Sequence, residues 1–124
     1  MPSILIIDDE RDVRATIRRV LERADYRVLE AADGREALEV ASRTPCDLVI
    51  TDINMPEMDG IEVIMTLAEK TPGLPVIAIS GGGKLPKELL LASADLLGAV
   101  TTLSKPFEIS ELLDAVRTAL ESRR

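Results

Sequence analysis

Short apolar runs alternate along the chain with longer stretches in which apolar residues recur every three or four positions. The short runs have the length and composition of β-strands and cover residues 3–7, 26–30, 47–51, 74–79 and 99–104. The longer stretches have the spacing of amphipathic helices and cover residues 10–24, 34–42, 61–70, 86–95 and a last segment from about 108. This alternation favours βαβ units and a parallel sheet, so we expect a single α/β domain over residues 1–124.

Polar residues at the expected helix ends agree with these limits. Asp33 suits an N-cap, because its carboxylate can accept a hydrogen bond from a backbone N–H of the next helix. Glu108 and Glu111 at the start of the last helix match the positive end of the helix dipole. The apolar stripe of that helix is predicted to consist of Ile109, Leu112, Leu113, Val116, Ala119 and Leu120.

Four of the expected strands run into polar residues of different chemical kinds. The first ends at Asp8 and Asp9, the third at Asp52, the fourth at Ser80 and the fifth at Lys105. In a parallel sheet these ends share one rim, and ligands of open α/β sheets bind along that rim. We therefore expect the acidic, hydroxyl and ammonium groups to meet in one site.

Together these side chains suit a divalent metal and a phosphoryl group. Mg²⁺ prefers hard oxygen ligands, typically one or two carboxylates and phosphate oxygens, and Asp8 or Asp9 with Asp52 would supply the carboxylates. An Asp carboxylate can also act as a nucleophile and form an aspartyl phosphate. Lys105 would neutralise charge on the transferred group, and the hydroxyl of Ser80 would donate a hydrogen bond to its oxygens.

Composition excludes several other classes of function. The formal net charge is −7 and Tyr26 and Phe107 are the only aromatic residues, so the chain offers neither a phosphate-backbone surface nor a base-stacking platform. There is no His, which excludes His-based catalysis, and Cys46 is a single Cys that we expect to be buried or half-buried. No apolar stretch reaches the roughly 20 residues of a membrane span. Since Met1 lies just before the first strand, leaving no signal peptide, we expect a cytoplasmic protein.

In order and spacing, the polar motifs resemble those of the receiver domain of bacterial response regulators in two-component signalling. The matching segments extend over essentially the whole chain and are Ile6-Ile7-Asp8-Asp9-Glu10, Asp52-Ile53-Asn54-Met55-Pro56, Asp59-Gly60, Ile79-Ser80-Gly81, Gly98-Ala99 and Lys105-Pro106-Phe107. Each segment alone is a weak signal, whereas the ordered set is specific. The resemblance implies a flavodoxin-like, doubly wound, five-stranded parallel sheet of order 2-1-3-4-5 with five helices.

The resemblance also implies a role for each residue of the rim. Asp52 would accept the phosphoryl group from a phosphohistidine of a partner. Mg²⁺, or Mn²⁺ in its place, would be bound by Asp9, Asp52 and the backbone carbonyl of Asn54, with Asp8 acting mostly through water. The phosphoryl oxygens would be bound by Ser80, Gly81 and Lys105. A cis peptide between Lys105 and Pro106 is a further expectation.

The partners that the resemblance implies are a sensor histidine kinase or a histidine phosphotransfer protein, and a separate effector. No output domain is expected in this chain, and its chemistry would be limited to its own phosphorylation and dephosphorylation. The surface expected to bind partners, or a second copy in a weak dimer, combines the fourth helix, fifth strand and last helix and includes Thr102, Lys87, Glu88 and Glu111. Because Thr102 replaces the family's aromatic switch residue, we expect a muted switch or one carried by the loop with Gly82 and Lys84.

A phosphatase of the haloacid-dehalogenase type is the strongest alternative. That family also uses an Asp nucleophile after a strand, but it normally requires a second Asp two residues later as general acid. Here that position is Asn54, and the acidic pair comes first in the chain instead of last. An electron-transfer flavin module shares the fold class, yet Asp8 and Asp9 would repel the flavin phosphate. Turnover of a phosphomonoester would distinguish the phosphatase from the receiver.

Overall fold

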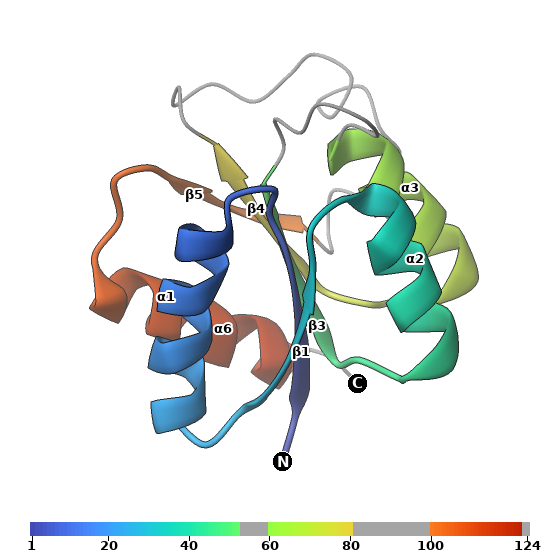
Figure 1. Ribbon diagram of the computed structural model, residues 1–124. Coiled ribbons are helices and arrows are strands. Elements are labelled where there is room, and N and C mark those ends of the chain that lie inside the picture. The colour runs from blue at the N-terminus through green and yellow to red at the C-terminus, as the bar shows by residue number, and fades with distance from the viewer. Residues whose placement is uncertain (53–59, 81–99, 123–124) are drawn as a thin grey trace.

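Five parallel strands form one sheet in the computed structural model, which describes residues 1–52, 60–80 and 100–122. The strands are β1 (Ser3–Ile7), β2 (Arg27–Ala31), β3 (Leu48–Asp52), β4 (Val76–Ser80) and β5 (Val100–Ser104). Their order in the sheet is β2-β1-β3-β4-β5 (Figure 1), which confirms the expected order. All neighbouring strands are parallel, so their carboxyl ends lie along the same rim.

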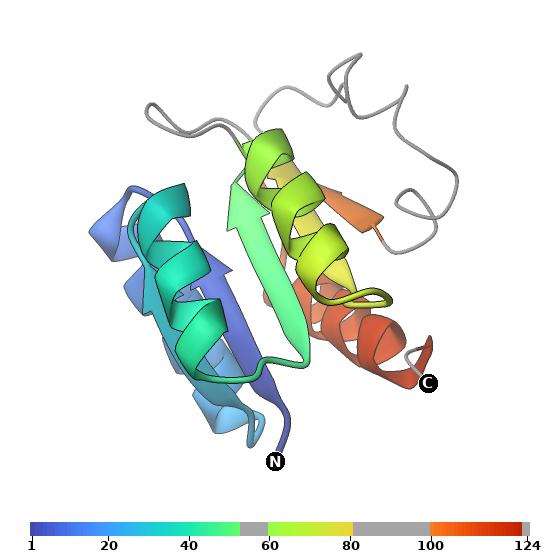
Figure 2. The same ribbon diagram turned by 90° about the vertical axis from the view of Figure 1, so that its right-hand side faces the viewer.

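Helices cover both faces of this sheet. Figures 1 and 2 show α1 (Arg11–Arg23) and α6 (Ile109–Ser122) on one side of the sheet. On the other side lie α2 (Gly34–Arg43) and α3 (Gly60–Lys70). The helix expected over residues 86–95 lies outside the described residues. Within the described part of the chain, the architecture is the expected doubly wound α/β sheet.

The central strands alternate between two apolar layers. In β1, Leu5 and Ile7 pack with residues of α2 and α3, whereas Ile4 and Ile6 pack with residues of α1 and α6. Both faces are therefore buried, which explains a strand without alternating polar positions. The predicted stripe of α6 is wrong at Ile109, which is 60% exposed, because this first residue of the helix borders an open hollow and does not lie within the layer.

The end of α1 determines where β2 begins. Asp25 adopts a left-handed conformation with φ 68°, and its N–H donates to the carbonyl of Glu22 while that of Tyr26 donates to the carbonyl of Leu21. These two bonds define a Schellman motif. Because Tyr26 belongs to this motif, pairing of β2 with β1 starts at Arg27, one residue later than predicted.

Carboxylate side chains accept backbone hydrogen bonds at the starts of α2 and α6, and the cap of α2 was predicted. The carboxylate of Asp33 accepts a hydrogen bond from the N–H of Glu36 at 2.8 Å, confirming the predicted N-cap of α2. At α6, the Glu111 carboxylate accepts from the N–H of Glu108 at 3.1 Å, which is the returning half of a capping box. The side chain of Glu111 therefore helps to begin its own helix.

Candidate functional site

The strand register brings the predicted rim residues together. Ile7 of β1 lies opposite Thr51 of β3, and Asp52 lies opposite Ile79 of β4. On the other side of β4, Ser80 lies opposite Ser104, which directly precedes Lys105. The four strand ends named by the sequence therefore meet at one edge.

An acidic cluster occupies this edge. Asp8, Asp9 and Asp52 each offer a carboxylate oxygen, and the three oxygens lie within 4.8 Å of one another. Asp8 is 1% exposed and Asp52 is 7% exposed, whereas Asp9 is exposed. Such crowded carboxylates repel one another, and a bound dication would relieve the repulsion.

Asp8 is the most buried member of the cluster. Its Oδ1 accepts a hydrogen bond from the N–H of Glu10 at 2.8 Å, while its buried Oδ2 makes none among the described residues. Burial raises the pKa of the Asp8 carboxyl, the N–H of Glu10 lowers it, and the negative charge of Asp52 raises it, so the pKa lies above its ordinary value. An unsatisfied carboxylate oxygen beside two other carboxylates suits a hydrated Mg²⁺ ion, which needs oxygen ligands and acceptors for its water.

Lys105 brings the positive charge predicted for the site. Its Nζ lies 3.5 Å from Oδ2 of Asp52, and its side chain is 32% exposed. The peptide bond between Lys105 and Pro106 is cis, as the resemblance implied. The ammonium group thus reaches across from β5 to the carboxylate at the end of β3.

A network around Arg14 was not singled out by sequence reasoning. Nη1 of Arg14 donates to the backbone carbonyl of Asp8 at 2.6 Å, and its Nε donates to Oε1 of Glu30 at 3.1 Å. Nη1 of Arg18 donates to the other oxygen of Glu30 at 2.6 Å. The sequence pattern that could have indicated this network is a pair of Arg residues four positions apart on one helix face, together with an acidic residue inside the next strand.

Several predicted site residues are only partly placed, or not placed, by the structure. Residues that lie outside the described ranges are Asn54, Gly81, Gly82, Lys84, Lys87 and Glu88. Ser80 is described by its position in β4, next to Asp52 along the rim. Thr102 and Glu111 are exposed, on β5 and α6 respectively.

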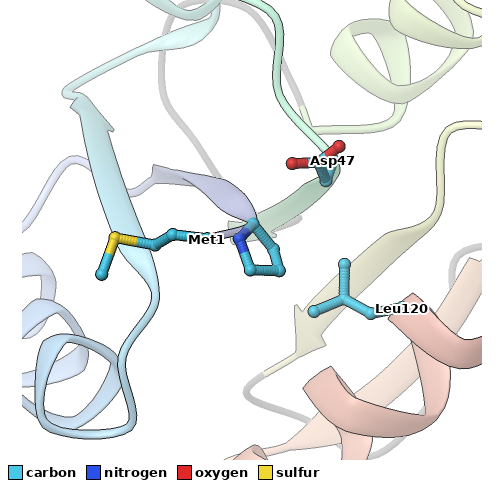
Figure 3. Close-up of a pocket in the computed structure, with 4 residues that line it drawn as sticks. Met1, Asp47 and Leu120 are labelled. Atoms are coloured by element: carbon cyan, nitrogen blue, oxygen red, sulfur yellow. The ribbon is translucent and has the colours of Figure 1, made fainter.

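A shallow pocket of about 420 Å³ lies at the opposite end of the sheet and is lined by Met1, Pro2, Asp47 and Leu120 (Figure 3). Asp47 precedes β3 and its carboxylate accepts a hydrogen bond from the N–H of Ser3 at 2.8 Å. This pocket therefore lies between the amino ends of β1 and β3 and the end of α6, and no predicted site residue is among the described residues that line it.

The arrangement matches a known family over nearly its whole length. Residues 4–117 match the model of the response regulator receiver domain, and the chain belongs to this family. Receiver domains are signalling phosphoacceptors that bind Mg²⁺ at an acidic pocket and interact with histidine kinases or phosphotransferases. Among the described helices, none is long and apolar enough to cross a membrane.

Individual relatives differ in how much of their length the chain covers. It is 37% identical over 123 residues to the C4-dicarboxylate transport transcriptional regulatory protein DctD of Rhizobium meliloti, covering 99% of this chain and 26% of that protein. It is 34% identical over 118 residues to sporulation initiation phosphotransferase F of Bacillus subtilis, covering 95% of this chain and 93% of that protein. The response regulator TrrA of Thermotoga maritima, solved in complex with Mg²⁺-BeF, has a TM-score of 0.82 and 28% identity, with 97% of this chain and 100% of that chain covered.

Proposed function

We propose that Asp52 accepts a phosphoryl group from a phosphohistidine of a partner protein. The proposal rests on one arrangement of charges. Carboxylate oxygens of Asp8, Asp9 and Asp52 lie within 4.8 Å of one another, and the ammonium group of Lys105 lies 3.5 Å from Asp52. A carboxylate nucleophile next to a cation site and a fixed positive charge has the features that phosphoryl transfer requires. The fold places this nucleophile at the carboxyl-end rim of the parallel sheet, where ligands of such folds bind.

In the transfer, a carboxylate oxygen of Asp52 forms a bond to phosphorus as the bond from phosphorus to the donor imidazole nitrogen breaks. The electron pair of the broken bond stays on the imidazole. Lys105 stabilises the negative charge on the phosphoryl oxygens, and Ser80 and Gly81 are proposed to donate hydrogen bonds to them. In dephosphorylation, a water oxygen forms a bond to phosphorus as the bond to the Asp52 oxygen breaks, which releases inorganic phosphate and returns the Asp52 carboxylate.

Mg²⁺ is the proposed cofactor, with Mn²⁺ as a substitute. The proposed ligands are Asp9, Asp52 and the carbonyl of Asn54, with Asp8 holding bound water. When bound, the ion neutralises charge between the carboxylates and the incoming phosphoryl group. The buried, unsatisfied Oδ2 of Asp8 supports this assignment, as does the Mg²⁺-containing complex of TrrA.

The proposed donor is a sensor histidine kinase or a histidine phosphotransfer protein, and the proposed target is a separate effector. The relative named as a phosphotransferase, which this chain covers over 93% of its length, supports a phosphoryl-carrying role. Exposed Thr102 and Glu111 are proposed to contribute to the effector or dimer surface, together with Lys87 and Glu88. Residues 1–124 are proposed to act as one cytoplasmic receiver unit, as a monomer or weak dimer.

The test is the intact mass of the protein after incubation with a small phosphoryl donor, with and without Mg²⁺. Wild type should gain one phosphoryl group only when Mg²⁺ is present, and Asp52→Asn should gain none. Asp47→Asn, which changes an Asp at the opposite end of β3, is the matched control and should be labelled like wild type. An unlabelled wild type, beside a receiver that is labelled in the same mixture, would contradict the proposal.

A phosphatase would act on other molecules, whereas the proposed receiver acts only on itself. The same protein should therefore release no more than one phosphate per chain from a generic phosphomonoester over the time in which a small donor labels Asp52. Continuous release that is lost in Asp52→Asn would instead establish the haloacid-dehalogenase type of activity.

A further inference from the structure

The turn between β1 and α1 carries two of the three carboxylates, so its position determines the shape of the acidic site. Both backbone polar groups of Asp8, the N–H and the carbonyl, make hydrogen bonds to residues outside this turn. Its N–H donates to the carbonyl of Ala31 in β2 at 3.2 Å, and its carbonyl accepts from Nη1 of Arg14 at 2.6 Å. The second contact comes from a side chain, which makes it open to substitution.

Arg14 is itself fixed from the neighbouring strand. Its Nε lies 3.1 Å from Oε1 of Glu30, and its side chain is 14% exposed. A guanidinium group presents several donors in one rigid plane, so one side chain can hold the Asp8 carbonyl and Glu30 at the same time. The ammonium group of Lys is smaller and not planar, and it cannot reproduce both contacts with one geometry.

The charges of this network suit a position beside a cation site. A lone Arg there would repel a metal ion, but Glu30 neutralises Arg14 directly. Hydrogen bonds from Arg18 and Arg14 outweigh the effect of burial and hold the pKa of the Glu30 carboxyl below its ordinary value. Glu30 is therefore ionised at neutral pH, and Arg14 can hold the turn without an uncompensated charge.

We infer that Arg14 is a positioning residue for the acidic site, holding the Asp8 carbonyl so that Asp8 and Asp9 keep the spacing that a divalent cation needs. The inference rests on the proposed function, because it assumes that the cluster binds Mg²⁺. Arg14 acts through the backbone of Asp8 and is not assigned any contact with the ion or the phosphoryl group. Groups that orient metal ligands in this indirect way commonly alter metal affinity by about tenfold or more.

Arg18 offers a matched control on the same helix. Its Nη1 binds the other oxygen of Glu30 at 2.6 Å, and no contact between Arg18 and the β1–α1 turn is found among the described residues. Replacing Arg18 thus removes a similar ion pair to Glu30 while leaving the Asp8 carbonyl and its hydrogen bond intact.

The experiment compares Arg14→Lys and Arg14→Gln with Arg18→Lys and Arg18→Gln in the full chain. Mg²⁺ is titrated at a temperature where every variant is folded, and the backbone amide signals of Asp9 and Glu10 report binding. Urea unfolding without Mg²⁺ measures the stability of each variant. Both Arg14 variants should bind Mg²⁺ about tenfold more weakly, whereas both Arg18 variants should lose stability but bind like wild type.

The outcomes separate this inference from the proposed function. Wild-type affinity in both Arg14 variants would overturn the inference alone, and so would an equal loss of affinity in the Arg18 variants, since the network would then have a merely structural role. A wild type that binds no Mg²⁺ would overturn the proposed function together with the inference. Glu30→Gln, which leaves Arg14 without its counter-charge, should weaken Mg²⁺ binding in the same direction as the Arg14 variants.

Discussion

The proposed role of Lys105 is to stabilise the transferred phosphoryl group and not to bind the metal. Its ammonium group lies 3.5 Å from Asp52, where it can stabilise phosphoryl oxygens but competes with a cation for the same carboxylate. Lys105→Met should therefore slow labelling of Asp52 by about a hundredfold while Mg²⁺ affinity stays equal to or above that of wild type. Lys70→Met, at the exposed end of α3, should change neither. Parallel loss of labelling and Mg²⁺ binding in Lys105→Met would contradict this separation of roles.

Among the described residues, Asp25 is the non-Gly residue with a left-handed backbone conformation. Its φ of 68° lies in the left-handed region, which Gly adopts without steric cost and an Asp side chain does not. Asp25→Gly should raise the free energy of unfolding by about 0.5 kcal/mol, and Asp25→Ala should lower it by a similar amount. Urea unfolding of the two variants checks the sign, and a loss of stability in the Gly variant would contradict the prediction.

For individual residues, the sequence predicted the charged side chains of the site but not the ion pair that holds the turn carrying Asp8. Asp8, Asp52 and Lys105 were predictable because each ends a predicted strand or directly follows its end. Arg14 and Glu30 were not, since the contact between them depends on how α1 lies against β2, and apolar periodicity does not fix which polar residues face each other across that boundary.

At the scale of elements, the strands and helices of the described residues agree with the predicted ones to within two residues at each end. The fourth strand was predicted from Leu74 but begins at Val76, because the N–H of Leu74 donates to the carbonyl of Thr71 in the turn after α3. Pro75 has no N–H to offer a neighbouring strand, although its carbonyl accepts from Val49. Backbone hydrogen bonds that close turns thus set the ends of elements, and apolar patterns do not contain them.

Glu30 ties α1 to the edge strand β2, and this tie depends on pH. Hydrogen bonds from the two Arg residues, against the effect of burial, lower the pKa of Glu30 below 4.5. Its contribution to stability is therefore present at neutral pH and is lost as pH falls through the lowered value. Glu30→Gln should reduce the free energy of unfolding by about 1 kcal/mol at pH 7, and its difference from wild type should shrink as pH falls through the lowered pKa of Glu30.

The control for this pH effect is Glu22→Gln. Glu22 is half exposed and pairs with Arg18 alone among the described ion pairs, so its loss should cost only about 0.3 kcal/mol at pH 7. Urea unfolding of both variants across this pH range would give the two profiles. A Glu30→Gln deficit that is constant from neutral to acid pH would show that packing, and not charge, accounts for its effect.

At the scale of the whole molecule, the site exists because a single strand order unites distant parts of the chain. β1 and β3 are neighbours, and β4 lies between β3 and β5, so residues 8, 52 and 105 reach one rim. The apolar pattern predicts parallel strands but not their order, which followed from the resemblance to receiver domains. Burial of the central strands on both faces then makes the rim a rigid platform for the carboxylates.

Gathering these carboxylates should lower the stability of the whole fold when no cation is bound. Three carboxylates face one ammonium group among the described site residues, and burial together with the charge of Asp52 raises the pKa of Asp8, so ionising Asp8 is less favourable in the folded chain. Asp52→Asn removes one charge of the cluster and should raise the free energy of unfolding without Mg²⁺ by about 1 kcal/mol. Asp114→Asn, which removes an exposed charge on α6, controls for net charge and should give no such gain.

Binding of Mg²⁺ should make wild type more stable than Asp52→Asn, which reverses the order of stability expected without the ion. At ten times its dissociation constant, a ligand that binds only the folded state adds about 1.4 kcal/mol to its stability, and this gain should appear in wild type and be largely lost in Asp52→Asn. Urea unfolding with and without Mg²⁺ measures both effects in one series. An equal Mg²⁺ response in the two proteins would mean that the ion binds elsewhere, whereas a crossing of their stabilities would show that the charge cluster lowers stability in the absence of the ion that it binds.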